Sequence, residues 1–155
     1  MIKILAPAKI NLTLEVLSRR KDGYHEIRSV MQAVSLYDQL SFETADGLRL
    51  ITSNSKVTEK DNLVYRAAQL LQQVSGAKKG AHIILNKNIP DSSGFGGGSS
   101  DAASTLLALN DLWHLGLSTE TLLKTGGDLG SDVPFFISGI PAVLEGRGEI
   151  IRPLD

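Results

Sequence analysis

The sequence contains no cysteine in its 155 residues. Disulfide bonds and thiolate metal sites are therefore excluded, and the composition fits a reducing compartment. An excess of either charge is also missing, because 16 lysines and arginines stand against 17 aspartates and glutamates, for a formal net charge of −1. A nearly neutral chain without an arginine cluster gives no electrostatic reason to expect a nucleic-acid partner or an anionic membrane.

Long apolar runs are absent as well. The apolar stretch at the N-terminus is too short for a signal sequence, and Pro7 and Lys9 interrupt it. No run in the sequence approaches the length that spans a membrane. We therefore expect a cytoplasmic protein with no membrane partner. The length and the 42% hydrophobic content are typical of one folded unit with its own core, and the oligomeric state stays open.

The first third of the sequence has the patterns of β-strands. Apolar and polar residues alternate over 10–16, which predicts a half-buried strand. After a turn signal at 21–23, the apolar and β-branched run over 27–34 predicts a second strand. Two further strands over 39–44 and 48–52, separated by AlaAspGly, predict a β-hairpin.

The spacing of apolar residues then becomes helical. A helix is predicted from residue 63, with Asp61 as its N-cap and Gly76 as its stop. The remaining predicted elements are a strand over 81–86, an apolar helix from about Ser99, a helix from Ser118 to about Gly126–Gly127, and strands over 135–137 and 142–144. Because no repeat or linker interrupts this order, the sequence predicts a single α+β unit.

A glycine-rich stretch lies between the predicted strand over 81–86 and the helix that follows it. Four glycines occur within residues 94–98, and Ser99, Ser100 and Asp101 provide capping oxygens at the expected helix start. Consecutive backbone N–H groups beside a helix N-terminus can bind phosphate. The dinucleotide-binding, P-loop and protein-kinase motifs are all absent. A flexible connector or a tight strand–helix corner is the alternative, and the hydroxyls and carboxylate favour phosphate binding.

Two other stretches carry polar groups in apolar surroundings. Lys9 and Asn11 lie on the polar face of a predicted strand, and Asp132 stands between a glycine and an apolar, proline-containing segment. A strand-edge lysine that faces water and an aspartate in a turn are the simpler interpretations. Together with the glycine-rich stretch, however, these residues would supply a phosphate cradle, a cation and a carboxylate.

Five motifs in order resemble the N-terminal part of the GHMP kinases, the superfamily of galactokinase, homoserine kinase, mevalonate kinase and phosphomevalonate kinase. The motifs are PAKINL at 7–12, DGYHE at 22–26, DNLVYRA at 61–67, PDSSGFGGGSSDAA at 90–103 and LGSDVPFF at 129–136. The resemblance implies an α+β lobe, similar to the second domain of ribosomal protein S5, with a mixed sheet and helices packed on one side. The chain departs from the usual motifs at Ser92, Ser93, Phe95 and Ser131.

The resemblance also implies roles for particular residues. ATP would be the phosphoryl donor, and Mg²⁺ is implied without an assigned protein ligand. Asp132 would accept or orient the proton of the acceptor hydroxyl, and Lys9 would stabilise that carboxylate and the transferring group. The ATP-binding residues would be Asn62, Leu63, Pro90, Asp91, Ser92, Ser93, Gly94, Phe95, Gly96, Gly97, Gly98, Ser99 and Ser100.

Through this resemblance, the motif at 22–26 implies a small-molecule acceptor that carries cytidine diphosphate on a sugar alcohol. Tyr24 would stack on the cytosine, His25 would bind its edge, and Asn11 would hold the acceptor hydroxyls. A strand aromatic and an exposed turn histidine are the alternatives for Tyr24 and His25. The alternatives for the whole protein are a GHMP kinase with a mevalonate-like or sugar acceptor, or a non-catalytic nucleotide- or RNA-binding module on the same fold.

Members of the superfamily are longer than this chain and carry a second lobe that closes over the substrates. We therefore expect residues 1–155 to form the ATP-binding lobe, with the C-terminal lobe absent from this chain. We also expect the chain alone to fold but to turn over poorly, because an open cleft places the acceptor loosely.

Overall fold

The computed structural model describes the chain except residues 22, 24, 54–57, 92, 147–149 and 155. In chain order the elements are β1 (Ile2–Arg19), β2 (His25–Ala45), β3 (Leu48–Thr52), the short 3₁₀ helix η1 (Glu59–Asp61), α1 (Leu63–Ser75), β4 (Gly80–Asn86), α2 (Gly97–Leu112), α3 (Thr119–Leu129), α4 (Val133–Ser138), β5 (Ala142–Gly146) and β6 (Ile150–Pro153). The strands of this described part form one mixed sheet in the order β3-β4-β2-β5-β6, with β1 paired to β2.

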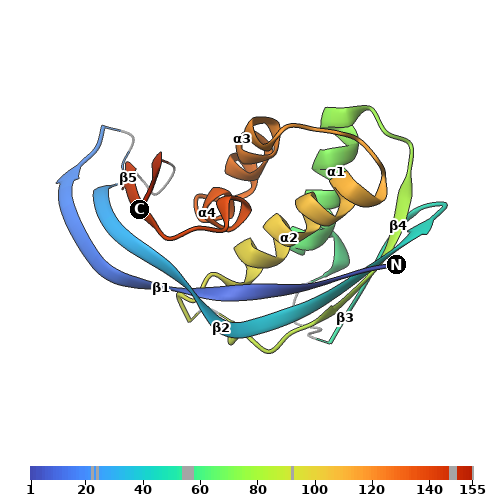
Figure 1. Cartoon of the computed structure of the whole chain (residues 1–155), viewed down its shortest axis with the longest axis horizontal. Coiled ribbons are helices and arrows are strands. Elements are labelled where there is room, and N and C mark those ends of the chain that lie inside the picture. Colours follow the sequence, from blue (N-terminus) through green and yellow to red (C-terminus); the bar gives the residue numbers. More distant parts are fainter. Residues whose placement is uncertain (22, 24, 54–57, 92, 147–149, 155) are drawn as a thin grey trace.

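β1 and β2 form a long antiparallel ribbon that curves across the molecule (Figure 1). The strands predicted over 10–16 and 27–34 are confirmed, as parts of these two longer strands. The prediction that the first is half-buried is wrong, because Leu12, Leu14 and Val16 are 59%, 59% and 62% exposed. Alternation leads to burial only where a second layer covers the strand, and burial along β1 ends at Ile10.

The predicted hairpin is also wrong. β2 and β3 are neighbours in sequence, but β4 lies between them, antiparallel to β2 and parallel to β3. Gly80 begins β4 close to the connection between β2 and β3, where a Cβ atom would lie 2.5 Å from the carbonyl oxygen of Ala45. Glycine is therefore required at this position. The turn signal at 45–47 is local, and it contains no information about a strand inserted from 33 residues further along.

The helices pack on one side of the sheet, as the resemblance implies (Figure 1). α1 and α2 pack against each other, and α2 also contacts β1 and β2. The largest fully buried side chains of the hydrophobic core include Trp113, Phe42 and Leu106. The indole N–H of Trp113 donates to the carbonyl oxygen of Gly80 over 3.1 Å, which joins the end of α2 to the start of β4.

The boundaries of two helices differ from the predictions. Asn62, and not Asp61, is the N-cap of α1, because its side chain accepts a hydrogen bond from the N–H of Val64 over 2.9 Å. α3 begins at Thr119, one residue after the predicted start at Ser118, which is its N-cap, and the helix continues past Gly126 to Leu129. A Cβ atom on Gly126 would lie 2.7 Å from the Cδ1 atom of Ile137. This glycine therefore serves close packing and does not end the helix.

The strand predicted over 135–137 is wrong, whereas the one over 142–144 is confirmed as part of β5. Residues Val133–Ser138 form α4, with Pro134 in its first turn, where the fixed φ of proline suits a helix. Gly139, with φ of 69°, follows the last helical residue. A short apolar run does not distinguish a strand from a buried helix. This helix matters for the site because Asp132 immediately precedes it.

Candidate active site

The glycine loop, residues 90–96, connects β4 to α2 as predicted, although the helix begins at Gly97 and not at about Ser99. Gly96 is the N-cap of α2 and has φ of 71°, a conformation that favours glycine. A Cβ atom on Gly96 would lie 3.1 Å from the Cγ atom of Lys9 and equally close to the ring of Phe136. The loop therefore depends on glycine here both for its backbone conformation and for its close approach to β1.

The predicted capping by Ser99, Ser100 and Asp101 is wrong, because all three lie inside the helix. Among the described residues, no side chain caps α2. Since the first N–H groups of a helix have no acceptor within it, those at the start of α2 are available to a ligand. They border a cavity of about 610 Å³, lined by Leu63, Lys87, Pro90, Asp91, Ser93, Gly94 and Gly96 to Ser99.

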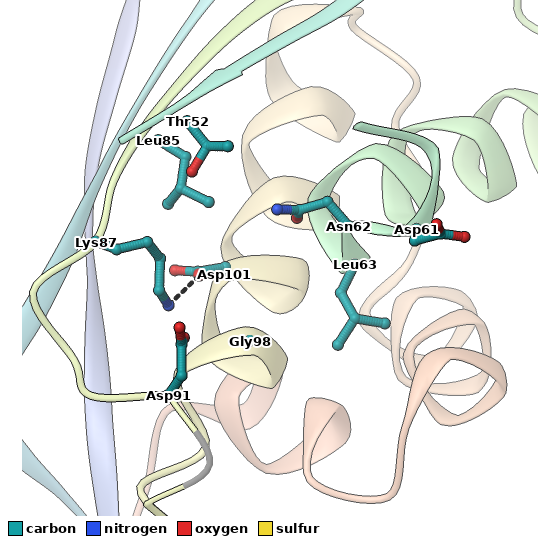
Figure 2. A pocket seen from close by; sticks show the side chains of 9 residues that line it. All are labelled: Thr52, Asp61, Asn62, Leu63, Leu85, Lys87, Asp91, Gly98 and Asp101. Atoms are coloured by element: carbon teal, nitrogen blue, oxygen red, sulfur yellow. Dashed lines mark hydrogen bonds and ion pairs between the residues drawn. The ribbon is translucent and has the colours of Figure 1, made fainter. Parts of the chain in front are cut away.

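A second cavity, of about 170 Å³, lies beside the first, near the start of α1, and Figure 2 shows the side chains that line it. It is lined by Thr52, Asp61, Asn62, Leu63, Leu85, Lys87, Asp91, Gly98 and Asp101. The two cavities share four lining residues, Leu63, Lys87, Asp91 and Gly98. The structure thus brings Asn62 and Leu63 beside the glycine loop, as expected for residues that share one ligand. A cavity lined by backbone amides joined to a smaller, partly apolar one has the form of a nucleotide site.

Some predicted ATP-binding residues are placed differently. Ser100 is fully buried, and its Oγ atom has no hydrogen-bond partner among the described residues. The hydroxyl of Ser93 donates to the carbonyl oxygen of Pro90 over 2.7 Å and therefore holds the loop itself. Phe95 contributes its carbonyl oxygen to a bond with β1. Ser92 lies outside the described residues.

The side chains of Lys9 and Asp132 lie close together, and Lys9 also contacts the glycine loop. Lys9 is 7% exposed, and its Nζ atom donates to Oδ1 of Asn11 over 2.6 Å and lies 3.6 Å from Oδ2 of Asp132. The backbone N–H of Lys9 donates to the carbonyl oxygen of Phe95 over 2.9 Å. Burial contradicts the simpler interpretation of Lys9 as a lysine that faces water. The Asp132 side chain remains 32% exposed, so a ligand can reach its carboxylate.

The sequence patterns did not indicate Ser29, which belongs to this network. Nδ2 of Asn11 donates to Oγ of Ser29 over 2.5 Å, and that hydroxyl donates to the carbonyl oxygen of Thr13 over 2.6 Å. Ser29 is fully buried on β2. These bonds fix the orientation of the Asn11 amide, so that its oxygen points to Lys9. Only the register of β1 on β2 places Ser29 here, and no local motif reveals it.

Lys87 also belongs to the candidate site, and no local sequence motif indicates it. Its Nζ atom pairs with Asp38 and, over 2.8 Å, with Oδ2 of Asp101. Oδ1 of Asp38 accepts hydrogen bonds from the backbone N–H groups of Asn88 and Ile89 over 2.5 and 2.9 Å. Burial raises the pKa of Asp101 to about 7, although Lys87 acts in the opposite direction. Burial alone would lower the pKa of Lys87, but the charge of Asp101 and the hydrogen bonds to both carboxylates raise it.

Of the two expected cytosine-binding residues, His25 is the one that the structure describes, and it lies away from the Lys9–Asp132 pair. Tyr24 is outside the described residues. His25 is exposed at the start of β2, paired with Arg19, whereas Lys9 is paired with Ala33. Eight residues separate His25 from Ala33, which is roughly 26 Å along an extended strand at about 3.3 Å per residue. His25 therefore does not contact the Lys9–Asp132 pair.

Two negative findings concern only the described residues. No three histidine, cysteine, aspartate or glutamate side chains there gather as ligands for a metal ion. Mg²⁺ in nucleotide sites is usually held by one or two carboxylates together with phosphate oxygens and water, so this donor set does not conflict with Mg²⁺ that arrives with a nucleotide. No helix in the described ranges is long and apolar enough to cross a membrane.

Residues 62–140 match the family described as "GHMP kinases N terminal domain", and the chain belongs to this family. It is 47% identical over 154 residues to the 4-diphosphocytidyl-2-C-methyl-D-erythritol kinase of Thermodesulfovibrio yellowstonii, with 99% of this chain and 54% of the relative covered. It is 51% identical over 155 residues to the enzyme of that name from Symbiobacterium thermophilum, with 99% of this chain and 55% of the relative covered. The chain therefore spans about half the length of these relatives.

Two solved structures have a fold similar to that of this chain. A crystal structure of 4-(cytidine 5'-diphospho)-2C-methyl-D-erythritol kinase superposes with a TM-score of 0.87 at 42% identity, over 99% of this chain and 55% of that one. The mevalonate kinase of Methanococcus jannaschii superposes with a TM-score of 0.72 at 16% identity, over 99% of this chain and 56% of that one. The second likeness is one of fold alone. The predicted fold class, a GHMP kinase lobe with a mixed sheet, is confirmed.

Proposed function

We propose that this chain is the ATP-binding lobe of an enzyme that phosphorylates a hydroxyl of 4-diphosphocytidyl-2-C-methyl-D-erythritol. The observation that carries the proposal is the position of the Lys9–Asp132 pair directly against the glycine loop. The names of the relatives support this choice of acceptor. Because the chain spans about half of those relatives, the activity is proposed for the chain together with the remainder that they carry.

The nucleotide would occupy the two joined cavities. Its phosphates would lie in the larger one, where the N–H groups at the start of α2 and the helix dipole favour negative charge. The adenosine part would occupy the smaller one, between Asn62, Leu63 and Leu85. Mg²⁺, bound through the phosphate oxygens, would offset charge on the triphosphate.

The acceptor hydroxyl would lie at Asp132. Its oxygen forms a bond to the γ-phosphorus, the bond from that phosphorus to the β–γ bridging oxygen breaks, ADP leaves, and the hydroxyl proton passes to the carboxylate of Asp132. Lys9, 3.6 Å from this carboxylate, would stabilise the negative charge on the transferring group. Asn11 holds Lys9 through its amide oxygen and borders the place that the acceptor hydroxyl would take.

The remote position of His25 suits an extended acceptor. A diphosphate and a ribose separate the cytosine from the methylerythritol hydroxyls, so residues that recognise the base must lie far from the reacting oxygen. We propose that His25, at the far end of the β1–β2 ribbon, recognises the base together with Tyr24. We also propose that the reaction belongs to isoprenoid precursor synthesis in the cytoplasm, which a chain without cysteine fits.

A phosphoryl-transfer assay tests the proposal. 4-Diphosphocytidyl-2-C-methyl-D-erythritol, mevalonate and galactose are offered separately with labelled ATP to this chain and to a fusion that adds the remaining half of the Thermodesulfovibrio yellowstonii relative. We expect the fusion to phosphorylate only the cytidine compound, and the chain alone to do so slowly. An Asp132→Asn fusion serves as the control. A preference for mevalonate or galactose would overturn the proposed acceptor.

A further inference from the structure

Lys87, Asp38 and Asp101 form a buried group that we call the Lys87 cluster. One ammonium group pairs with two carboxylates, and the exposed fractions of the three side chains are 13%, 0% and 3% in that order. Asp38 comes from β2, Lys87 follows β4, and Asp101 lies in α2. With one positive and two negative charges, the fully ionised cluster carries a net charge of −1 in a place that water scarcely reaches.

The two carboxylates are not equivalent. Asp38 uses both oxygens, since Oδ2 pairs with Lys87 and Oδ1 accepts from the backbone N–H groups of Asn88 and Ile89. Asp101 uses only Oδ2, because its Oδ1 is buried and has no hydrogen-bond partner among the described residues. A buried, unpaired carboxylate oxygen is unfavourable, and protonation removes its charge. Asp101 is therefore the member of the cluster that gains a proton most easily.

The cluster borders the cavities assigned to the nucleotide. Lys87 and Asp101 line the smaller cavity, and a dashed line joins them in Figure 2. Lys87 also lines the larger one, and its Nζ atom lies 3.1 Å from the position that a Cβ atom on Gly97 would take. The ammonium group is thus next to the first turn of α2, where phosphate would bind.

The charged side chains that line the smaller cavity outside the Lys87 cluster are all negative. Apart from the cluster, the ionisable side chains that line it are Asp61, before α1, and Asp91, from the glycine loop. Both are acidic, and β3 contributes only the neutral Thr52. A bound polyphosphate adds further negative charge, which disfavours the ionised form of Asp101 and competes for the positive charge of Lys87.

We propose that Asp101 takes up one proton from solvent when a nucleoside polyphosphate binds, and that the charge of Lys87 is then available to the phosphates. The inference rests on the proposed nucleotide site. It assigns Asp101, a residue inside the helix behind the glycine loop, to the binding of the nucleotide. Binding is then tighter at lower pH, because the proton that Asp101 must gain is more available.

Calorimetry with MgADP at pH 8, in two buffers of different ionisation enthalpy, measures the uptake directly. Since burial raises the pKa of Asp101 to about 7, we expect about 0.9 proton per nucleotide. Between pH 7 and 8.5 the dissociation constant should rise by up to about tenfold per pH unit. In Asp101→Asn, which resembles the protonated form, the uptake should vanish and the affinity should exceed that of the wild type at pH 8. Asp111→Asn, on the exposed side of the same helix, should behave as the wild type.

A ¹³C NMR titration of the Asp101 carboxyl group needs no variant. The midpoint should lie near pH 7 without nucleotide and move upward with MgADP. A midpoint below pH 5, or MgADP binding whose heat is the same in both buffers, would overturn the inference while leaving the nucleotide site intact. An equal proton uptake in Asp101→Asn would assign the proton to another group and also overturn it. Failure of the wild type to bind MgADP at any pH would overturn the proposed nucleotide site, and the inference with it.

Discussion

The backbone N–H of Lys9 donates to the carbonyl oxygen of Phe95 over 2.9 Å, so the glycine loop is joined to β1 at the residue whose side chain faces Asp132. Gly96 follows Phe95 and lies against the Lys9 side chain. The position of the loop and the position of the Lys9 side chain are therefore coupled. A change at Gly96 should affect both.

Gly96→Ala tests this coupling. The new Cβ atom would crowd Cγ of Lys9 at 3.1 Å, and φ of 71° strains any residue that has a side chain. We expect MgADP affinity, measured by calorimetry, to fall at least about tenfold, which corresponds to roughly 1.4 kcal/mol. Gly116→Ala is the matched control, because Gly116 has a similar φ of 65° but no atom within 4 Å of the added Cβ. Unchanged MgADP affinity in a folded Gly96→Ala variant would show that the loop is only a connector.

The raised pKa of Asp101 predicts how stability depends on pH. Its folded-state pKa, about 7, exceeds the ordinary value of 3.8, so the folded state favours the protonated form. The stability that this protonation contributes is complete below about pH 4 and is lost as the pH rises to about 7. We therefore expect the unfolding free energy of the wild type, relative to Asp101→Asn, to fall over this range and then stay constant. Urea unfolding at pH 5 and pH 8 measures the difference, and a relative stability that rises with pH would contradict the prediction.

Most of the site could be predicted because its residues lie in motifs that are short in sequence. The glycine loop connects a strand to a helix, and Lys9 and Asn11 lie two residues apart on one face of a strand, so local patterns locate both. The pairing of Lys9 with Asp132 depends on the whole fold, and only the resemblance to a family suggested it. The proposed catalytic roles of these residues remain predictions.

The errors arise where tertiary structure overrides a local signal. The apolar residues of β1 beyond Ile10 alternate as in a half-buried strand, but they lie on a part of the ribbon that is not covered. β4 enters between β2 and β3 from a distant part of the sequence. Lys87 and Ser29 belong to the site through contacts with residues 14 or more positions away, so no short motif contains them.

His25→Ala tests whether this residue recognises cytosine. If His25 binds the edge of the base, its removal leaves polar atoms of the base without a partner, which costs about 1–3 kcal/mol. We expect KM for the cytidine substrate to rise about 5- to 150-fold, with KM for ATP unchanged. Steady-state kinetics of the fusion measure both constants. Equal effects on the two substrates would assign His25 a structural role.

Ser29→Ala tests whether this residue positions Asn11. Without the Ser29 hydroxyl, the NH₂ group of Asn11 loses its acceptor, and the bond from Lys9 alone holds the amide less firmly. We expect kcat of the fusion to fall roughly tenfold, equivalent to about 1.4 kcal/mol, while KM for ATP is unchanged. Ser29→Thr retains the hydroxyl and should restore kcat. If both variants lose the same fraction of kcat, the packing of Ser29 matters and its hydroxyl does not.

Lys9 and Asp132 should act as a unit. Asp132→Asn keeps the shape of the side chain but removes its charge and basicity, so we expect kcat of the fusion to fall about 10²–10⁴-fold while nucleotide affinity is retained or increases. Lys9→Met should also reduce kcat strongly, because Asp132 and the transferring phosphoryl group both lose their cation. In the double variant the losses should not add, and kcat should be close to that of the worse single variant. Single-turnover kinetics of the four proteins measure this coupling. Additive losses would mean that the two side chains, although 3.6 Å apart, act independently.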